Sequence, residues 1–157
     1  MRRFHSTVRR ARIALAAILV VCAAGWAEAA QCTVATTSVN FGTYDVFATS
    51  PNDSTGTVTL NCNGGARNVA ITISNGSAVS YAFRFMNKGL ELLLYNLYLD
   101  ASRTVIWGDG SGGSEMEIVS NPVNNKDHPL TIFARIPAGQ DVSAGSYTDT
   151  VTVTVQY

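Results

Sequence analysis

The sequence has few of the residues from which catalytic and metal sites are usually built. It contains two histidines and three cysteines in 157 residues, and only 14% of its residues are charged. It has no G-x-S-x-G elbow, no CxxC pair and no acidic residues at EF-hand spacing. After residue 25 no apolar run approaches the roughly 20 residues that span a bilayer. These absences exclude a membrane-spanning mature chain and leave no strong motif for a hydrolase, a zinc site or a calcium site.

The N-terminal residues are typical of a secretory signal peptide. Residues 2–12 contain five arginines and no acid, residues 13–25 are uniformly apolar, and a small-residue site follows at Ala27, Glu28 and Ala29. We therefore expect residues 1–29 to be removed on export and residues 30–157 to form one mature domain. Without the five arginines and Glu28, six basic and ten acidic side chains remain of the 11 and 11 in the whole chain. The resulting net charge of about −4 argues against a basic nucleic-acid-binding protein.

The cysteines indicate a disulfide. Cys22 lies in the predicted signal peptide, so Cys32 and Cys62 are the two cysteines expected in the mature domain. An exported chain enters an oxidising compartment, where such a pair is expected to be oxidised. A redox or metal-binding pair is the alternative, but neither a CxxC motif nor paired histidines accompany these cysteines.

From residue 33 onward the pattern predicts an all-β fold. Short segments rich in Val, Ile, Thr, Tyr and Phe alternate with clusters of Gly, Asn, Asp, Ser and Pro about every ten residues, as in β-sandwiches and barrels. The leucine-rich residues 89–99 could form a helix, but the alternation around Tyr95, Leu97 and Leu99 favours a strand. The expected strands are 32–41, 55–62, 68–74, 81–86, 92–100, 104–107, 115–120, 130–136 and 146–157.

The last expected strand, 146–157, has two different faces. The apolar face consists of Tyr147, Val151, Val153, Val155 and Tyr157, together with Asp149, which we expect to bond a loop amide. The other face consists of Thr148, Thr150, Thr152, Thr154 and Gln156. A long, flat strand without Pro or Lys would aggregate if it were left at a sheet edge. It therefore needs a neighbour, from elsewhere in this chain or from another chain.

Tyr147 also has the placement of a tyrosine corner. It follows Gly145 and Ser146 at the start of a late strand, where its hydroxyl can bond the backbone upstream. We interpret this as a structural role.

The candidates for chemistry are weak. His128 precedes Pro129 in a polar segment, where we expect a surface loop, and Trp107 is expected to pack in the core or a loop. Residues 108–113 match G-x-G-x-x-G, but a strand rather than a helix is expected after them, so we interpret them as a turn. A carboxylate pair for glycoside hydrolysis is the remaining option. The possible pairs are Asp100 with Asp109 and Glu115 with Glu117.

A series of motifs resembles the spore coat protein U family. The motifs are Phe41-Gly-Thr-Tyr-Asp45, Cys62, Tyr95-Asn-Leu-Tyr98 followed by Asp100-Ala-Ser-Arg-Thr104, Trp107-Gly-Asp-Gly110, Ile136-Pro-Ala-Gly-Gln140 and Gly145-Ser-Tyr-Thr-Asp-Thr150. The resemblance extends from residue 32 to residue 157 and implies a relation to the pilin subunits of archaic chaperone-usher pili. It implies an immunoglobulin-like sandwich that lacks its last strand, and a structural protein without enzymatic activity, metal or cofactor.

The resemblance also implies partners and positions. A periplasmic chaperone lends the missing strand, an outer-membrane usher exports the subunit, and the N-terminal segment of another pilin-like subunit then replaces the chaperone strand. The protein would thus pass through the periplasm to the cell surface or the medium. The family disulfide corresponds to Cys32 and Cys62. The edge of the acceptor groove corresponds to Tyr147, Val151, Val153, Val155 and Tyr157.

One departure from the pilin pattern predicts a special role. A polymerising pilin carries, before its first cysteine, a donor segment of about ten alternating apolar residues. Here only Ala30 and Gln31 lie between the expected cleavage site and Cys32. We therefore expect a subunit that accepts a strand and does not donate one, at a fibre tip or outside fibres.

Two other functions remain open at the level of sequence. The first is a self-contained secreted β-sandwich that closes its own sheet with residues 33–41 and binds a surface glycan or protein. The second is a secreted hydrolase that uses Asp100, Asp109 or His128.

Overall fold

The computed structural model describes residues 29–157, so the signal peptide predicted at residues 1–29 lies outside the described residues except for Ala29. The described part is all-β apart from one short 3₁₀ helix, η1 (Tyr81–Phe83), and it contains no helix long and apolar enough to cross a membrane. The strands are β1 (Gln31–Thr37), β2 (Asn52–Asn63), β3 (Val69–Ile73), β4 (Arg84–Lys88), β5 (Glu91–Tyr98), β6 (Glu117–Val119), β7 (Asp127–Ile136) and β8 (Val153–Gln156).

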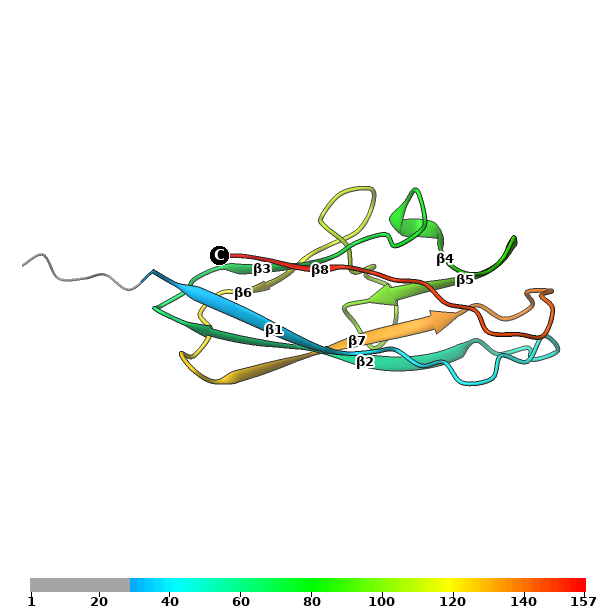
Figure 1. The fold of residues 1–157 in the computed structure, drawn as a ribbon, viewed down its shortest axis with the longest axis horizontal. Helices are drawn as coiled ribbons and strands as arrows, with labels where there is room; N and C mark the ends of the chain where they lie inside the picture. Colours follow the sequence, from blue (N-terminus) through cyan, green and yellow to red (C-terminus); the bar gives the residue numbers. More distant parts are fainter. Residues whose placement is uncertain (1–28) are drawn as a thin grey trace, which may run out of the picture.

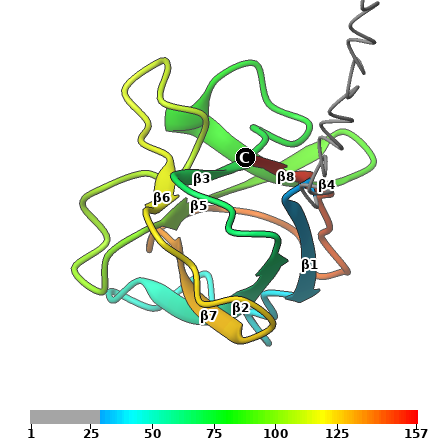
Figure 2. The ribbon, with the colours of Figure 1, turned by 90° about the vertical axis from the view of Figure 1, so that its left-hand side faces the viewer.

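The strands form an immunoglobulin-like β-sandwich of two antiparallel sheets, which confirms the predicted fold class. One sheet has the order β1-β2-β7-β5-β4 and the other has the order β6-β3-β8. The larger sheet curls, so that β4 and β5 lie on the same side of the sandwich as β3 and β8 (Figure 1). At one edge of the sandwich β1 lies beside β8 without pairing with it (Figure 2).

The core follows from alternation along the strands. Every second residue points inward and is buried along β3, from Gly56 onward in β2 and from Ile132 onward in β7. The buried side chains among them are Val58, Leu60, Cys62, Val69, Ile71, Ile73, Ile132, Ala134 and Ile136. Trp107 is also fully buried, and its indole N–H donates to the carbonyl of Ile71 at 3.0 Å. The expectation that Trp107 is a packing residue is confirmed.

The predicted disulfide joins the first two strands. Cys32 of β1 and Cys62 of β2 are direct partners in the antiparallel register, and their sulfurs are bonded. β1 pairs with β2 over its whole length, from Gln31 opposite Asn63 to Thr37 opposite Thr57.

Several local predictions are wrong. The expected strand at 81–86 begins as η1, and only Arg84–Lys88 form β4. Residues 104–107 form isolated bridges and no strand, because the Asp100 carboxylate accepts hydrogen bonds from the amides of Thr104 and Val105 and curls the chain into a turn. His128 lies within β7, not in a loop, opposite Leu60. Its Nε2 accepts the Val123 amide at 2.8 Å, so the ring fastens the segment before β7 to the sheet.

The C-terminal segment is less regular than the predicted strand 146–157. Only β8 (Val153–Gln156) forms a continuous ladder, which pairs with β3. Before β8 the chain makes one bridge, between Thr148 and Asn87 of β4. The segment therefore passes from the edge of one sheet to the edge of the other, and this crossing interrupts its pairing.

Candidate functional site

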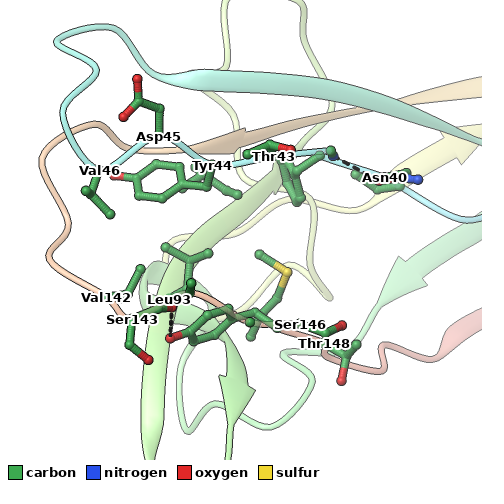
Figure 3. Close-up of a pocket in the computed structure, with 18 of the residues that line it drawn as sticks. Asn40, Thr43, Tyr44, Asp45, Val46, Leu93, Val142, Ser143, Ser146 and Thr148 are labelled. Atoms are coloured by element: carbon green, nitrogen blue, oxygen red, sulfur yellow. Dashed lines mark hydrogen bonds between the residues drawn. The ribbon is translucent and has the colours of Figure 1, made fainter.

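An apolar groove runs along one edge of the sandwich, between two segments that are mostly outside strands. One wall is residues 36–47, the end of β1 and the segment after it, and the other is residues 142–153, the segment before β8 and its first residue. Figure 3 shows the wider part of the groove, with Tyr44 and Val46 on one side and Val142 and Leu93 facing them.

The groove consists of two connected cavities. The wider one, about 1060 Å³, reaches the core residues Leu93 and Ile136, and the narrower one, about 370 Å³, reaches Tyr95, Leu97 and Ile132. Both cavities share one short stretch of lining, formed by Val39, Phe41, Met86, Tyr147 and Thr148. The floor of the groove is therefore the hydrophobic core itself.

The C-terminal wall has the two faces predicted from the sequence. Tyr147, Val151, Val153 and Val155 are half-buried and pack against the core, whereas the threonines between them are exposed. Tyr147, Val151 and Val153 also line a cavity. Tyr157 lies beyond β8 with 56% of its surface exposed and lines neither cavity.

The backbone of this wall pairs on one side only. Thr148 exchanges two hydrogen bonds with Asn87 of β4, and Thr152 accepts the Ser74 amide at 2.9 Å and donates to the Ser74 hydroxyl. Neighbouring residues of an extended chain turn their backbone groups to opposite edges. Among residues 29–157, the N–H and C=O groups of Tyr147, Asp149 and Val151 have no hydrogen-bond partner. An open row of backbone donors and acceptors therefore lies along the groove.

The opposite wall is held in place by side chains rather than by a ladder. The Tyr44 hydroxyl donates to the carbonyl of Pro137 at 3.0 Å and accepts the Gln140 amide at 2.9 Å. The Asn52 amide group donates to the carbonyls of Phe41 and Thr43. Sequence reasoning singled out residues 41–45 as a motif but missed their place in the groove. The available signal was a pair of aromatic residues in a Gly-containing segment without strand periodicity.

Asp149, between Tyr147 and Val151 on the apolar face, is held there by hydrogen bonds. Its carboxylate accepts the Ser77 amide at 3.1 Å and the Tyr95 hydroxyl at 2.8 Å. Burial, together with the hydrogen bond to Asp149, raises the pKa of Tyr95, so the phenol stays protonated and remains the donor. The expected bond from Asp149 to a loop amide is present. It joins the C-terminal wall to the loop after β3.

Tyr147 links the groove to the loop before it. Its ring lines both cavities, and its hydroxyl donates to the carbonyl of Ser143 at 3.0 Å, four residues upstream. This is the type of upstream backbone contact expected of a tyrosine corner.

Arg84, which sequence reasoning missed, is fully buried behind the groove. Its guanidinium donates to the carbonyls of Ser74 and Trp107 at 2.9 and 2.7 Å and to the side-chain oxygen of Asn96 at 2.7 Å. Burial lowers the pKa of Arg84. A single Arg at the start of an apolar strand gave no signal in the sequence that it would be internal.

The candidates for chemistry serve local turns. Asp100 is held by Thr104 and Val105, and Asp109 accepts the amide and hydroxyl of Ser111. Residues 108–113 form a turn in which Gly110, Gly112 and Gly113 have positive φ, as expected. Within residues 29–157 no three His, Cys, Asp or Glu side chains gather as metal ligands would.

Comparisons with known proteins agree with this architecture. The chain is 29% identical to Protein U of Myxococcus xanthus over 134 residues, which cover 76% of this chain and 72% of the relative. It shares its fold with a chain in the crystal structure of the CsuC–CsuE chaperone–tip adhesion subunit pre-assembly complex from the archaic chaperone-usher Csu pili of Acinetobacter baumannii. That match has a TM-score of 0.58 at 23% identity, and it covers 82% of this chain and 40% of the other. The family model for the Spore Coat Protein U domain matches residues 18–154, and the chain belongs to this family.

Proposed function

We propose that this chain is an exported structural subunit of a chaperone-usher type surface fibre or coat, and that its groove accepts a β-strand from another protein. The observation that carries the proposal is the combination of two features at one place. Core residues form the floor of the groove, and the backbone of its C-terminal wall presents unpaired groups at Tyr147, Asp149 and Val151. An added strand satisfies both needs, because its backbone pairs with the wall and its alternate side chains cover the core.

The proposed partners are those that such a groove requires. A periplasmic chaperone supplies the strand during export, an outer-membrane usher receives the complex, and other pilin-like subunits exchange strands with it. The fold shared with a chain from a chaperone–tip subunit complex supports this assignment. The proposed location is the periplasm in transit and then the cell surface or the medium, and the proposed role is structural rather than catalytic.

The pairing of β1 disfavours the self-contained alternative. A sandwich that closes its own last sheet needs residues 33–41 beside the C-terminal strand. In the structure β1 pairs with β2 through residue 37, and no ladder joins it to β8. The groove lies between these two segments instead.

We further propose that the subunit accepts a strand but does not donate one. The segment expected between signal-peptide cleavage and Cys32 is too short to fill a neighbour's groove, which suits a fibre tip or a coat protein. Mixing the purified subunit with a strand-complemented neighbour tests this role. One-to-one complexes are expected, whereas chains built from this subunit alone would contradict it.

Amide hydrogen exchange followed by NMR tests strand acceptance directly. The donor is a synthetic peptide of about ten residues with alternating Val and Thr, the length of a long strand. On addition of the peptide, the amides of Tyr147, Asp149 and Val151 should become protected, while the Thr148 amide, already bonded to Asn87, changes little. Unchanged exchange at the three odd-numbered residues with saturating peptide would refute the proposal.

A further inference from the structure

The C-terminal wall of the groove needs support that its own pairing does not supply. Residues 142–147 line the wider cavity but belong to no strand, and the nearest backbone pairing is the bridge at Thr148. Tyr147 and Val142 are apolar groups beside an open cavity. Water disfavours such exposed apolar surface, so an unsupported wall would relax inward and close the groove.

Four polar side chains hold this wall in place. Lys88 and Glu91 flank the turn between β4 and β5, and Ser143 and Tyr147 come from the wall itself. The Lys88 ammonium lies 3.2 Å from the Glu91 carboxylate, donates to the carbonyl of Ala144 at 2.9 Å and contacts the Ser143 hydroxyl. The Ser143 hydroxyl donates to Glu91 at 2.6 Å. We call these four residues the clasp.

The clasp determines where the Tyr147 ring lies. The Tyr147 hydroxyl contacts the Glu91 carboxylate as well as the Ser143 carbonyl, and the Lys88 ammonium lies 5.4 Å from the centre of the ring. The polar end of the side chain is thus fixed by its contacts with Ser143 and Glu91, while the ring lines both cavities. A Cβ on Gly145 would clash with Cδ of Lys88, so the absence of a side chain there lets the lysine reach across the wall.

We propose that the clasp is a positioning device that keeps the acceptor groove open for an incoming strand. This inference rests on the strand-acceptor function proposed above. Exposed ion pairs add little to the free energy of unfolding. The clasp instead raises the fraction of folded molecules whose groove is open to a donor strand. When that fraction drops, the apparent affinity for a donor drops in proportion.

The test compares donor affinity with stability in matched variants. Tyr147→Phe keeps the ring in the groove and removes its hydroxyl, and Glu91→Gln removes the negative charge of the clasp. The controls are Tyr98→Phe, on the same strand as Glu91 but away from the groove, and Glu115→Gln, whose exposed residue forms an isolated bridge with Trp107. Each chain is titrated with a fluorescein-labelled form of the alternating Val-Thr peptide, and urea unfolding without peptide is recorded in parallel.

We expect Tyr147→Phe and Glu91→Gln each to weaken peptide binding about tenfold, corresponding to a ready fraction reduced to about a tenth. Their unfolding midpoints without peptide should stay close to that of the unmodified chain, and both controls should bind normally. The double variant should bind no more weakly than the weaker single variant, because the two residues act through one cluster.

The possible failures are distinguishable. If the unmodified chain binds the peptide and both clasp variants bind equally well, the clasp does not position the wall. If the unmodified chain does not bind the peptide at all, strand acceptance itself is wrong and the clasp inference fails with it. If one variant does not fold, the other still provides the comparison.

Discussion

Arg84 shows how a single residue connects the parts of the molecule behind the groove. It is fully buried, and its charge is met by carbonyl groups and an amide oxygen rather than by a carboxylate. Its partners come from the loop after β3, from β5 and from Trp107, so one planar group satisfies acceptors of three chain segments. A buried cation with this many acceptors is costly to replace, because each acceptor that loses its donor stays dehydrated.

Arg84→Ala should therefore destabilise the fold by about 3–5 kcal/mol, the combined result of unsatisfied acceptors and a cavity. Arg84→Lys should also be destabilising, because an ammonium cannot reproduce the planar fork of donors. The matched control is Arg67→Ala at an exposed position, with an expected change within about 0.5 kcal/mol. Urea unfolding monitored by circular dichroism measures these free energies, and equal stability of the two alanine variants would contradict the account.

Glu91 predicts a pH dependence whose sign is clear. Hydrogen bonds from Ser143, Tyr147 and Lys88 lower the pKa of Glu91 from 4.5 to about 2. A carboxyl group with a depressed pKa in the folded state adds stability that is complete above pH 4.5 and disappears as the pH falls toward 2. Solvent screens this exposed charge, so only a small difference in urea midpoint is expected between the unmodified chain and Glu91→Gln, and it should disappear between pH 4.5 and pH 2. A difference that stays constant over this range would show that the Glu91 charge is not stabilised by its neighbours.

At the residue scale, odd or even position along a strand predicted the face on which a side chain lies, but not the residues that it contacts. It placed Tyr147, Val151 and Asp149 on one face correctly. It could not identify Ser77 and Tyr95 as the partners of Asp149, because these contacts join residues more than 50 positions apart. Arg84 was missed because its acceptors, 10 to 23 positions away, come from three other segments that only the fold brings together.

The C-terminal wall is the element on which the proposed function depends. Its alternation puts apolar side chains toward the core and threonines toward solvent, and its backbone pairs only through even-numbered residues. The crossing from β4 to β3 leaves the odd-numbered residues 147–151 facing the groove. The unpaired backbone groups of this wall therefore face the apolar groove and not bulk water, which is unusual for a sheet edge.

Substitutions on the two faces of this wall should affect peptide binding differently. Val151→Asp places a charge against the groove floor and should weaken binding of the alternating Val-Thr peptide by about 3 kcal/mol, or about a hundredfold. Thr152→Asp, one residue along on the exposed face, is the control and should bind the peptide almost normally. Fluorescence titration measures both. Similar affinities for the two variants would mean that the peptide does not lie along the apolar face.

At the element scale, the strands with clear period-two patterns were predicted well. The ambiguous residues 89–99 contain β5 (Glu91–Tyr98), which confirms a strand there although the expected strand was 92–100, and residues 55–62 lie within β2. The expected strand at 104–107 failed because the Asp100 side chain captures amides that a ladder would have used. The expected strand at 81–86 begins instead as η1, and only Arg84–Lys88 form β4. A side chain that accepts hydrogen bonds from nearby backbone amides acts locally. Whether the segment then forms a turn or a strand depends on whether another strand lies close enough to pair with it.

The disulfide acts at the scale of the whole molecule. It closes a loop of 30 residues between β1 and β2, and these strands carry the N-terminal wall of the groove. In the chain-entropy model a loop of this size contributes about 3–4 kcal/mol by restricting the unfolded chain. The double variant Cys32→Ser, Cys62→Ser should lose about this much free energy of unfolding. An unchanged urea midpoint would show that the disulfide adds nothing to β1–β2 pairing.

The architecture of the whole molecule was predictable because strand spacing and alternation specify a β-sandwich before any tertiary contact is known. The groove was only partly predictable. Its C-terminal wall was visible as an apolar strand face without a partner. Its N-terminal wall, residues 36–47, has no regular periodicity, and its position depends on Tyr44 and Asn52 contacts with distant carbonyls. The boundary of the mature domain at Ala29 stays a prediction.

The central claim is that the sandwich has an open groove completed by a strand from outside. Urea unfolding of the mature chain, recorded by circular dichroism with increasing concentrations of the alternating Val-Thr peptide, tests this claim most directly. A strand that binds only the folded form stabilises it by mass action, by about 2.7 kcal/mol at a hundred times its Kd. The account predicts an unfolding midpoint that rises steadily with peptide concentration, and a much smaller rise for Val151→Asp. A chain that unfolds cooperatively at the same urea concentration whatever the amount of peptide would show that the sandwich is already complete.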